Sequence, residues 1–221
     1  MSKVDTTAEA ERYSAERAGM VESQLRRRGI RDERVLEAML DIPRHEFVPD
    51  GYKSQAYEDH PIPIGEDQTI SQPFIIAVSL QALGLAGTEI VLEVGTGSGY
   101  QSALLAVLAR TVHSIERFAT LAHGAEKILS SLGLNNVTVV VGDGSHGLQE
   151  FAPFNAILVS AAAPSVPRSL LDQLSDSGRM VVPVGPPYSQ ELQLVRKQGG
   201  KVVAKVLEGC RFVPLIGVEG Y

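Results

Sequence analysis

The sequence feature that most restricts the fold is a glycine-rich stretch that follows a short apolar run. Residues 91–94 read Val-Leu-Glu-Val, and glycine then occupies positions 95, 97 and 99 before a helical pattern over residues 101–109. Glycine permits positive φ angles and lets the backbone come close to a ligand. The free N–H groups at the start of the helix point back at the turn. The stretch therefore predicts a strand, a tight turn and a helix, with a small polar or anionic molecule lying across Gly95–Gly99.

Details of the turn disfavour the common nucleotide motifs. A dinucleotide fingerprint needs a small residue at position 100, where this chain has Tyr100, and the Lys-Ser/Thr pair of a P-loop is missing. Glu116 ends the next predicted strand, about twenty residues beyond the turn, where an acid can hydrogen-bond a ribose diol. We therefore expect a nucleoside-containing cofactor other than NAD or ATP. The alternatives are a merely tight turn and a solvated carboxylate at Glu116.

Composition describes an ordinary globular chain. Its 221 residues suffice for one substantial core, 44% of them are hydrophobic and 21% are charged. The net charge of −6 gives no electrostatic reason to expect a nucleic-acid partner. No apolar stretch is long enough to cross a bilayer, no signal peptide is recognisable, and Cys210, the only cysteine, excludes an internal disulfide. We expect a cytoplasmic chain, and a monomer because no apolar patch points to a partner.

The chain divides into a predicted tail and one domain. Residues 1–17 are polar without apolar periodicity and predict a mobile tail, whereas residues 18–221 form the domain. Within it, residues 18–88 are expected to make an N-terminal cap and substrate segment, and residues 89–221 a cofactor-binding sheet.

The cap should be helical at both ends and irregular in the middle. Helices are expected over residues 18–28, over residues 33–40 with Asp32 as the N-cap, and over residues 74–85. Residues 43–73 contain five prolines together with apolar side chains. This composition predicts a packed segment without helix or strand that covers the cofactor.

Strands and helices alternate after the glycine turn. Strands are expected near residues 111–116, 137–142, 154–160 and 179–184, and helices near residues 100–109, 118–132 and 167–175. Such alternation predicts a parallel sheet covered on both faces. Three further strands without an intervening helix are expected near residues 191–196, 201–208 and 210–218, and Gly199-Gly200 predicts a hairpin turn. The sheet should therefore finish antiparallel.

Residues at the carboxyl ends of parallel strands are candidates for the site, because open sheets bind ligands there. Asp143, flanked by Gly142 and Gly144, is placed to accept a hydrogen bond from an adenine amine. A plain Asx turn is the alternative for this Asp-Gly pair. The strand near 154–160 is followed by small residues, Ser160-Ala-Ala-Ala-Pro164, which leave room for a bulky group.

Conventional catalytic constellations are missing from the sequence. The five histidines show no metal-ligand spacing, and no Gly-x-Ser-x-Gly elbow occurs. We therefore expect no metal site. The histidines should have structural or surface roles, and the Cys210 thiol should be inert.

Residues 92–100, Leu-Glu-Val-Gly-Thr-Gly-Ser-Gly-Tyr, resemble the first motif of class I S-adenosylmethionine-dependent methyltransferases. Further stretches resemble the protein-L-isoaspartate O-methyltransferases within that class, namely Ile42-Pro-Arg-His-Glu-Phe-Val-Pro49, Pro63-Ile-Gly65, Thr69-Ile-Ser-Gln-Pro73, Gly142-Asp-Gly144, Ala152-Pro-Phe-Asn-Ala156 and Arg211-Phe-Val-Pro-Leu215. The resemblance runs in order from about Met20 to Val218. Its most specific stretches are Thr69–Pro73 and Arg211–Leu215.

The resemblance implies an α/β fold: a Rossmann-like, doubly wound, mostly parallel seven-stranded sheet with an antiparallel C-terminal end and a small N-terminal helical and irregular cap. It implies a repair enzyme that moves the methyl group of S-adenosyl-L-methionine to the α-carboxylate of L-isoaspartyl residues in damaged proteins, releasing S-adenosyl-L-homocysteine. The ester then cyclises to a succinimide that partly reopens to aspartate. A carboxyl group with a pKa of about 3.5 is ionised near neutrality, so positioning and in-line transfer suffice without a general base.

The resemblance also implies roles for individual residues. Ser71 is the catalytic residue, which holds the substrate carboxylate. The implied cofactor-binding residues are Glu93, Gly95, Thr96, Gly97, Ser98, Gly99, Glu116, Asp143 and Gly144, and the implied substrate-binding residues are Thr69, Ile70, Ser71, Gln72 and Val213. Two positions depart from the family, which often has Thr at Ser160 and Trp at Ser145. Helix capping is the alternative role for Ser71, which lies just before Pro73.

Three other functions compete with this interpretation. One is methylation of a small metabolite or RNA, another is a non-catalytic S-adenosylmethionine-binding module, and the third is a nicotinamide oxidoreductase. Net acidity argues against RNA, the stretches containing Ser71 and Arg211 argue against both methyltransferase rivals, and Tyr100 argues against nicotinamide. The expected partners are isoaspartyl-containing peptides and proteins, with no nucleic acid and no membrane.

Overall fold

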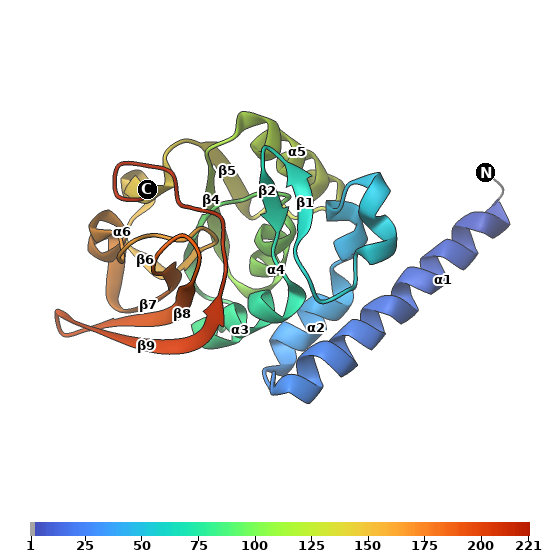
Figure 1. The fold of residues 1–221 in the computed structure, drawn as a ribbon, viewed down its shortest axis with the longest axis horizontal. Coiled ribbons are helices and arrows are strands. Elements are labelled where there is room, and N and C mark those ends of the chain that lie inside the picture. Colours follow the sequence, from blue (N-terminus) through green and yellow to red (C-terminus); the bar gives the residue numbers. More distant parts are fainter. Residues whose placement is uncertain (1–2) are drawn as a thin grey trace.

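The computed structural model describes residues 3–221, with side chains from Ala8 onward. Its centre is a seven-stranded sheet in the order β5–β4–β3–β6–β7–β8–β9 (Figure 1). The strands are β3 (Ile90–Val94), β4 (Thr111–Glu116), β5 (Val137–Val141), β6 (Phe154–Val159), β7 (Leu174–Val184), β8 (Gln190–Gln198) and β9 (Lys201–Cys210). Strands β3 to β7 pair in parallel, whereas β8 is antiparallel to β7 and to β9. The mostly parallel sheet with an antiparallel end confirms the predicted fold class.

Each face of the sheet has its own hydrophobic core. In β6, Ala156 and Leu158 belong to one core, and Ile157 and Val159 belong to the other. This alternation follows from the strand period of two residues. Helices cover both faces, and they are α2 (Glu33–Asp41), α3 (Pro73–Leu83), α4 (Tyr100–Leu108), α5 (Ala119–Ser131) and α6 (Arg168–Gln173). The first core includes residues of α2, α3 and α4, and the second includes Leu170 of α6.

A helix, α1 (Lys3–Gly19), occupies most of the segment for which the sequence predicted a mobile tail. It continues as a π-helical turn, Met20–Leu25, and a 3₁₀ turn, Arg26–Arg28. Tyr13 is 6% exposed, and its ring stacks on His45 with the centroids 3.9 Å apart. Apolar periodicity does not predict this helix, because Tyr13 is the only buried residue among its described side chains.

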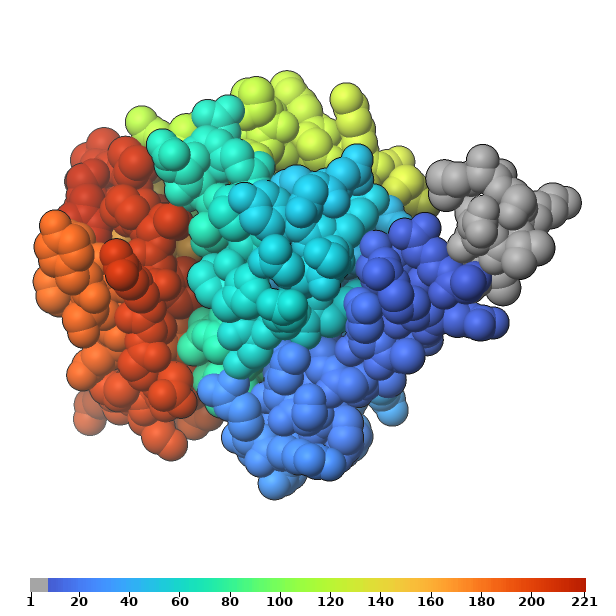
Figure 2. Space-filling view, turned by 45° about the vertical axis from the view of Figure 1, so that its right-hand side comes forward, coloured from blue at the N-terminus to red at the C-terminus, as the bar shows by residue number. Residues whose placement is uncertain are grey.

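The segment 43–73 contains more regular structure than the sequence predicted. It forms 3₁₀ turns at Arg44–Phe47 and Asp50–Gln55, and then a two-stranded hairpin of β1 (Ile62–Gly65) and β2 (Gln68–Ile70). Glu66 and Asp67 make the hairpin turn with φ angles of 52° and 56°, a conformation that Asn-Gly usually signals. Without that signal the hairpin was not predicted. Figure 2 shows this segment, in cyan, between the N-terminal helices and the C-terminal strands.

The chain after β9 corrects one further expectation. Residues 210–218 were predicted as a strand, but they cross the end of the sheet instead. Ala162 N–H donates to Val213 O at 2.8 Å, and Leu215 N–H donates to Ala162 O at 2.7 Å. These bonds bring the C-terminal segment to the carboxyl end of β6, and β9 is left as the edge strand.

Packing behind the glycine turn predicts the effect of one substitution. Gly99 has a φ of +88°, and a Cβ there would lie 2.9 Å from the Cβ of Ala125 in α5. Overpacking together with the strained φ should make Gly99→Ala lower the free energy of unfolding by about 1–3 kcal/mol, measured by urea denaturation. Gly124→Ala is the matched control. A Cβ there meets nothing within 4 Å, and alanine is favoured in a helix by about 1 kcal/mol. Unchanged stability of Gly99→Ala would contradict this account of the turn.

Candidate active site

Three glycines in the left-handed backbone region shape the turn between β3 and α4. Gly95, Gly97 and Gly99 all have positive φ angles, of 94°, 54° and 88°. A Cβ on Gly95 would lie 3.4 Å from the Cβ of Ser160, and one on Gly97 would lie 3.3 Å from Cδ1 of Ile64. At these three positions no side chain covers the backbone, so a ligand can lie against it.

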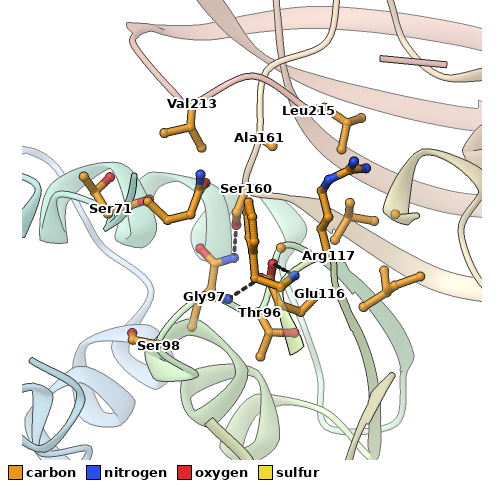
Figure 3. A pocket seen from close by; sticks show the side chains of 18 of the residues that line it. Ser71, Thr96, Gly97, Ser98, Glu116, Arg117, Ser160, Ala161, Val213 and Leu215 are labelled. Atoms are coloured by element: carbon orange, nitrogen blue, oxygen red, sulfur yellow. Dashed lines mark hydrogen bonds between the residues drawn. The ribbon is translucent and has the colours of Figure 1, made fainter. Parts of the chain in front are cut away.

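A pocket lies over this turn, at the carboxyl ends of β3, β4 and β6 (Figure 3). Ten of the predicted site residues line it, namely Thr69, Ile70, Ser71, Gly95, Thr96, Gly97, Ser98, Glu116, Gly144 and Val213. Four predicted residues do not line it, namely Gln72, Glu93, Gly99 and Asp143. The predicted residues thus converge from five separate stretches of the chain.

Glu116 ends β4 beside the turn. Its carboxylate accepts hydrogen bonds from Gly97 N–H at 2.8 Å and from Phe118 N–H at 3.0 Å, and the residue is 6% exposed. Two backbone donors thus hold the acid against the glycines. The arrangement leaves lone pairs of the carboxylate for a ligand hydroxyl in the pocket.

Glu93 lies behind the turn, fully buried. It accepts hydrogen bonds from the hydroxyls of Ser102 and Ser114, the latter at 2.6 Å, and from Gln101 Nε2 at 3.3 Å. Desolvation is the largest influence and raises the pKa of Glu93 to about 7, against the opposing effect of these donors. Glu93 therefore supports the turn from below, whereas the sequence had placed it among the residues that touch the cofactor.

Asp143 makes the Asx turn that was the alternative for its Asp-Gly pair. Its Oδ1 accepts from the Ser145 N–H at 2.9 Å and from the Ser145 hydroxyl at 2.8 Å, and its Oδ2 accepts from Val218 N–H at 3.1 Å. These donors hold its pKa below the usual value although desolvation, the largest influence, opposes them. The pocket wall at this point is Gly144, where a Cβ would lie 2.5 Å from Cγ1 of Val94.

Ser71 lies between β2 and α3 and does not cap the helix. The N-cap of α3 is Gln72, whose side chain makes no capping bond. Asp59 takes that role instead, because its Oδ1 accepts from Phe74 N–H at 3.1 Å and its Oδ2 accepts from Gln72 Nε2 at 2.7 Å. The Ser71 side chain is thus left for the pocket that it lines.

Arg44 holds the backbone of Ser71 from the inside. This residue is fully buried and donates from Nη2 to Ser71 O at 2.9 Å and from Nε to Ala56 O at 2.8 Å. Its guanidinium carbon lies 4.9 Å from the ring centroid of Tyr100. Desolvation lowers the pKa of Arg44 to about 10, so the group remains charged at neutral pH. A buried cation therefore stands behind the Ser71 segment.

A second cavity adjoins the first. Its wall includes Gln72, Cys210, Arg211 and Phe212, and it shares Thr69, Ser71, Ser160 and Val213 with the first cavity. The first cavity lies on the glycine turn, and the second faces away from it toward the end of β9. Two molecules bound in these cavities would meet at the shared residues.

The sequence did not predict three polar side chains that hydrogen-bond to the segments lining the pocket: Arg44, Asp59 and Gln101. Arg44 carried a weak signal, because it lies in a segment whose apolar residues Ile42, Phe47 and Val48 are expected to be buried. Asp59 and Gln101 carried none, since their partners lie 13 and 59 residues away in sequence.

The remaining polar candidates are structural. His45 Nδ1 is hydrogen-bonded to the Tyr57 hydroxyl at 2.7 Å, and His113 stacks on Phe151 with the ring centroids 4.0 Å apart. Burial raises the pKa of the Cys210 thiol to about 11, which leaves it un-ionised. Within residues 3–221, no cluster of His, Cys, Asp and Glu has metal-binding geometry, and no helix is long and apolar enough to cross a membrane.

Comparison with known proteins gives consistent matches over almost the whole chain. A family model for protein-L-isoaspartate(D-aspartate) O-methyltransferase matches residues 16–220. A protein-L-isoaspartate O-methyltransferase from Koribacter versatilis is 55% identical over 209 residues, which are 95% of this chain and 94% of that protein. One from Methanoculleus marisnigri is 52% identical over 213 residues, with 96% of this chain and 97% of that protein covered.

Solved structures give the same result. A structure named protein-L-isoaspartate O-methyltransferase superposes with a TM-score of 0.83 and 30% identity, covering 92% of this chain and 67% of that one. A Plasmodium falciparum protein assigned to the same family, crystallised with S-adenosyl-L-homocysteine, has a TM-score of 0.80 and 27% identity, covering 90% of this chain and 98% of that one.

The position of Glu116 predicts that Glu116→Ala weakens binding of S-adenosylmethionine by about tenfold, because a hydrogen bond to a charged acceptor contributes on the order of 1.5 kcal/mol. Isothermal titration calorimetry measures the affinity. Glu126→Ala, an exposed acid on α5, is the control and should bind normally. Equal affinities of the two variants would remove Glu116 from the cofactor site.

Burial of Glu93 predicts a pH-dependent loss of stability. Its pKa is raised in the folded state, so folding favours the protonated acid, and the resulting stability is complete below about pH 4.5 and lost as pH rises through about 7. The loss is on the order of 3 kcal/mol. Glu93→Gln cannot ionise, so its free energy of unfolding, measured by urea denaturation from acidic to alkaline pH, should lack this decline. If the free energy of unfolding falls equally with pH in the wild type and in Glu93→Gln, Glu93 is not the source of the decline.

Proposed function

The chain belongs to the protein-L-isoaspartate(D-aspartate) O-methyltransferase family, and we propose that its two adjoining cavities carry out the transfer of a methyl group from S-adenosyl-L-methionine to the α-carboxylate of L-isoaspartyl residues in damaged proteins. The observation that carries the proposal is the set of residues common to both cavities, Thr69, Ser71, Ser160 and Val213. A cofactor on the glycine turn and a carboxylate entering from the second cavity would meet there.

The first cavity suits S-adenosylmethionine. Glu116, held by Gly97 N–H, is an acceptor for the ribose diol, and the bare turn from Gly95 to Ser98 leaves space for the methionine portion. Four apolar residues line the same pocket as Glu116 and form a surface on which an adenine ring would pack. They are Ile115, Phe118, Leu215 and Ile216. Gly144 adds a flat surface there, because its backbone packs against Val94 with no space for a Cβ.

The chemistry makes few demands on acids and bases. S-adenosylmethionine supplies an electrophilic methyl group on a sulfonium. An α-carboxylate with a pKa of about 3.5 is already ionised near neutral pH, so no side chain has to remove a proton. The residues must instead align the carboxylate and exclude water, and alignment of this kind contributes on the order of 7–11 kcal/mol. The structural roles of His45 and His113 are compatible with this mechanism.

Ser71 is the residue to which we assign the substrate carboxylate. Its hydroxyl can donate to the oxygen that does not attack, which orients the other oxygen toward the cofactor. Arg44 and Asp59 hold the segment on both sides of it, at Ser71 O and at Gln72 Nε2. The buried charge of Arg44 also favours an anion nearby. We retain Thr69, Gln72 and Val213 as further contacts to the substrate.

The expectations of a monomer, of a cytoplasmic location and of no nucleic-acid partner stay proposals. The net charge of −6 supports the last of these, and the single cysteine supports a reducing compartment. Sedimentation equilibrium measures the oligomeric state.

Methyl transfer to a synthetic peptide tests the function. With labelled S-adenosylmethionine, a peptide that contains L-isoaspartate should acquire base-labile label, and the same peptide with ordinary aspartate should acquire none. Label on neither peptide, with the cofactor still bound, would show that the substrate is a different one.

Ser71→Ala should lower kcat/KM for the isoaspartyl peptide by at least about tenfold, the loss of roughly 1.4 kcal/mol of transition-state stabilisation. The dissociation constant of S-adenosylmethionine should not change. Ser130→Ala, an exposed serine on α5, serves as the control. Full activity of Ser71→Ala would remove Ser71 from the mechanism.

A further inference from the structure

Ser160 lies where the two cavities meet. It directly follows β6, and its N–H donates to Val94 O at 2.8 Å, next to the glycine turn. It lines the first cavity, with the turn, and the second, with Cys210 and Phe212. Figure 3 shows its side chain near the centre of the pocket, on a different wall from Ser71. A hydroxyl in this place can reach a carboxylate that enters from the second cavity.

The hydrogen bond behind Ser160 has a defined direction. Gln101 Nε2 lies 2.5 Å from Ser160 Oγ (dashed in Figure 3) and 3.3 Å from Glu93 Oε1. An amide NH₂ group has two protons and no acceptor, so Ser160 Oγ must accept. An ionised carboxylate only accepts, so Glu93 requires the NH₂ end of Gln101 on its side. Glu93 thereby determines which end of the amide faces Ser160.

The other hydroxyls around Glu93 follow the same logic. Ser102 and Ser114 both donate to Glu93 Oε2. Because Ser114 has used its proton, Thr96, whose Oγ1 lies 2.5 Å from Ser114 Oγ, is the donor in that pair. The hydroxyl protons of Ser102 and Ser114 and one amide proton of Gln101 are therefore directed at the carboxylate, that of Thr96 at Ser114, and the second amide proton of Gln101 at Ser160. Among the described residues, the Ser160 hydroxyl makes no hydrogen bond other than the one that it accepts.

We propose that the Ser160 hydroxyl is a second donor to the substrate α-carboxylate, acting from a different wall than Ser71, with Gln101 and Glu93 as the residues that direct its proton into the site. This assignment rests on the function proposed above. With Gln101 behind it as a donor, Ser160 can offer only its proton to the shared space. Two donors from different walls hold the plane of a carboxylate, which one donor alone leaves free to rotate about its hydrogen bond.

The role of Ser160 in substrate binding is separable from a role in cofactor binding. Ser160→Ala should lower kcat/KM for an isoaspartyl peptide at least about tenfold at about pH 8, where Glu93 is mostly ionised. The dissociation constant of S-adenosyl-L-homocysteine, measured by calorimetry, should change less than about twofold. Ser160→Thr keeps the hydroxyl and should recover most of the lost rate. An unchanged kcat/KM in Ser160→Ala, or weaker cofactor binding with normal peptide kinetics, would overturn the proposal.

Reversing the hydrogen bond between residue 101 and Ser160 shows whether Gln101 orients the Ser160 proton or only packs against the serine. Gln101→Glu is nearly isosteric, but its carboxyl group presents lone pairs to Ser160, because any proton shared with Glu93 lies on the Glu93 side. Ser160 must then donate to residue 101 and turn its own lone pairs toward the substrate. The loss in kcat/KM should be at least as large as in Ser160→Ala. In the Ser160→Ala background the same change should cost less than about twofold, since no hydroxyl remains to be turned.

The double variant provides the decisive comparison. If the fold losses in kcat/KM of the two single variants multiply in full in S160A/Q101E, Gln101 acts independently of Ser160, and the proposal is overturned. Thermal unfolding followed by circular dichroism shows whether each variant is folded, and if Gln101→Glu does not fold, the Ser160→Ala and Ser160→Thr pair decides alone. If the wild-type enzyme labels no isoaspartyl peptide, the proposed function itself is contradicted. If the wild type labels the peptide and Ser160→Ala labels it equally well, only the proposal for Ser160 is contradicted.

Discussion

One buried carboxylate, Glu93, connects the elements from which the cofactor side of the site is built. It lies on β3 and accepts hydrogen bonds from Ser102 on α4 and from Ser114 on β4. Through Gln101 it also reaches Ser160 at the end of β6. Burial of a charge is unfavourable unless its hydrogen bonds are made, so these groups are constrained together. These bonds fix the start of α4 and the strand β4 on either side of the glycine turn.

The substrate side depends on a second constraint, formed by residues that precede it in the chain. Arg44 and Asp59 hold the segment around Ser71 by its carbonyl, by the Gln72 side chain and by the start of α3. Methyl transfer to a carboxylate needs the acceptor oxygen, the methyl group and the sulfur in line, and it needs no proton transfer. Two independently supported walls that meet at Ser71 and Ser160 supply such alignment. The site therefore performs its chemistry by geometry, and no histidine is among the described residues that line either cavity.

Local sequence patterns predicted those parts of the structure that depend on local signals. The glycine spacing from Gly95 to Gly99 and the alternation of apolar strands with helices gave the turn and the sheet, and the topology of an open sheet then gave the strand-end candidates such as Glu116. The hairpin turn was missed because its two central residues, Glu66 and Asp67, are neither glycine nor asparagine, and α1 was missed because Tyr13 is the only buried residue among its described side chains. Glu93 and Asp143, which the resemblance implies as cofactor contacts, also make hydrogen bonds with the protein. Local pattern could not predict these bonds, because the partners Ser114 and Val218 are distant in sequence.

A crystal structure of the enzyme with S-adenosyl-L-homocysteine and an isoaspartyl peptide tests the central claim, that the two walls align the reacting groups. The account predicts that the α-carboxylate lies in the space common to both cavities, with its oxygens within hydrogen-bond distance of the hydroxyls of Ser71 and Ser160. One of these oxygens should lie on the line that extends from the sulfur through the missing methyl group. A carboxylate that lies outside this shared space, or that is held by other residues while the sulfur rests on the glycine turn, would contradict it.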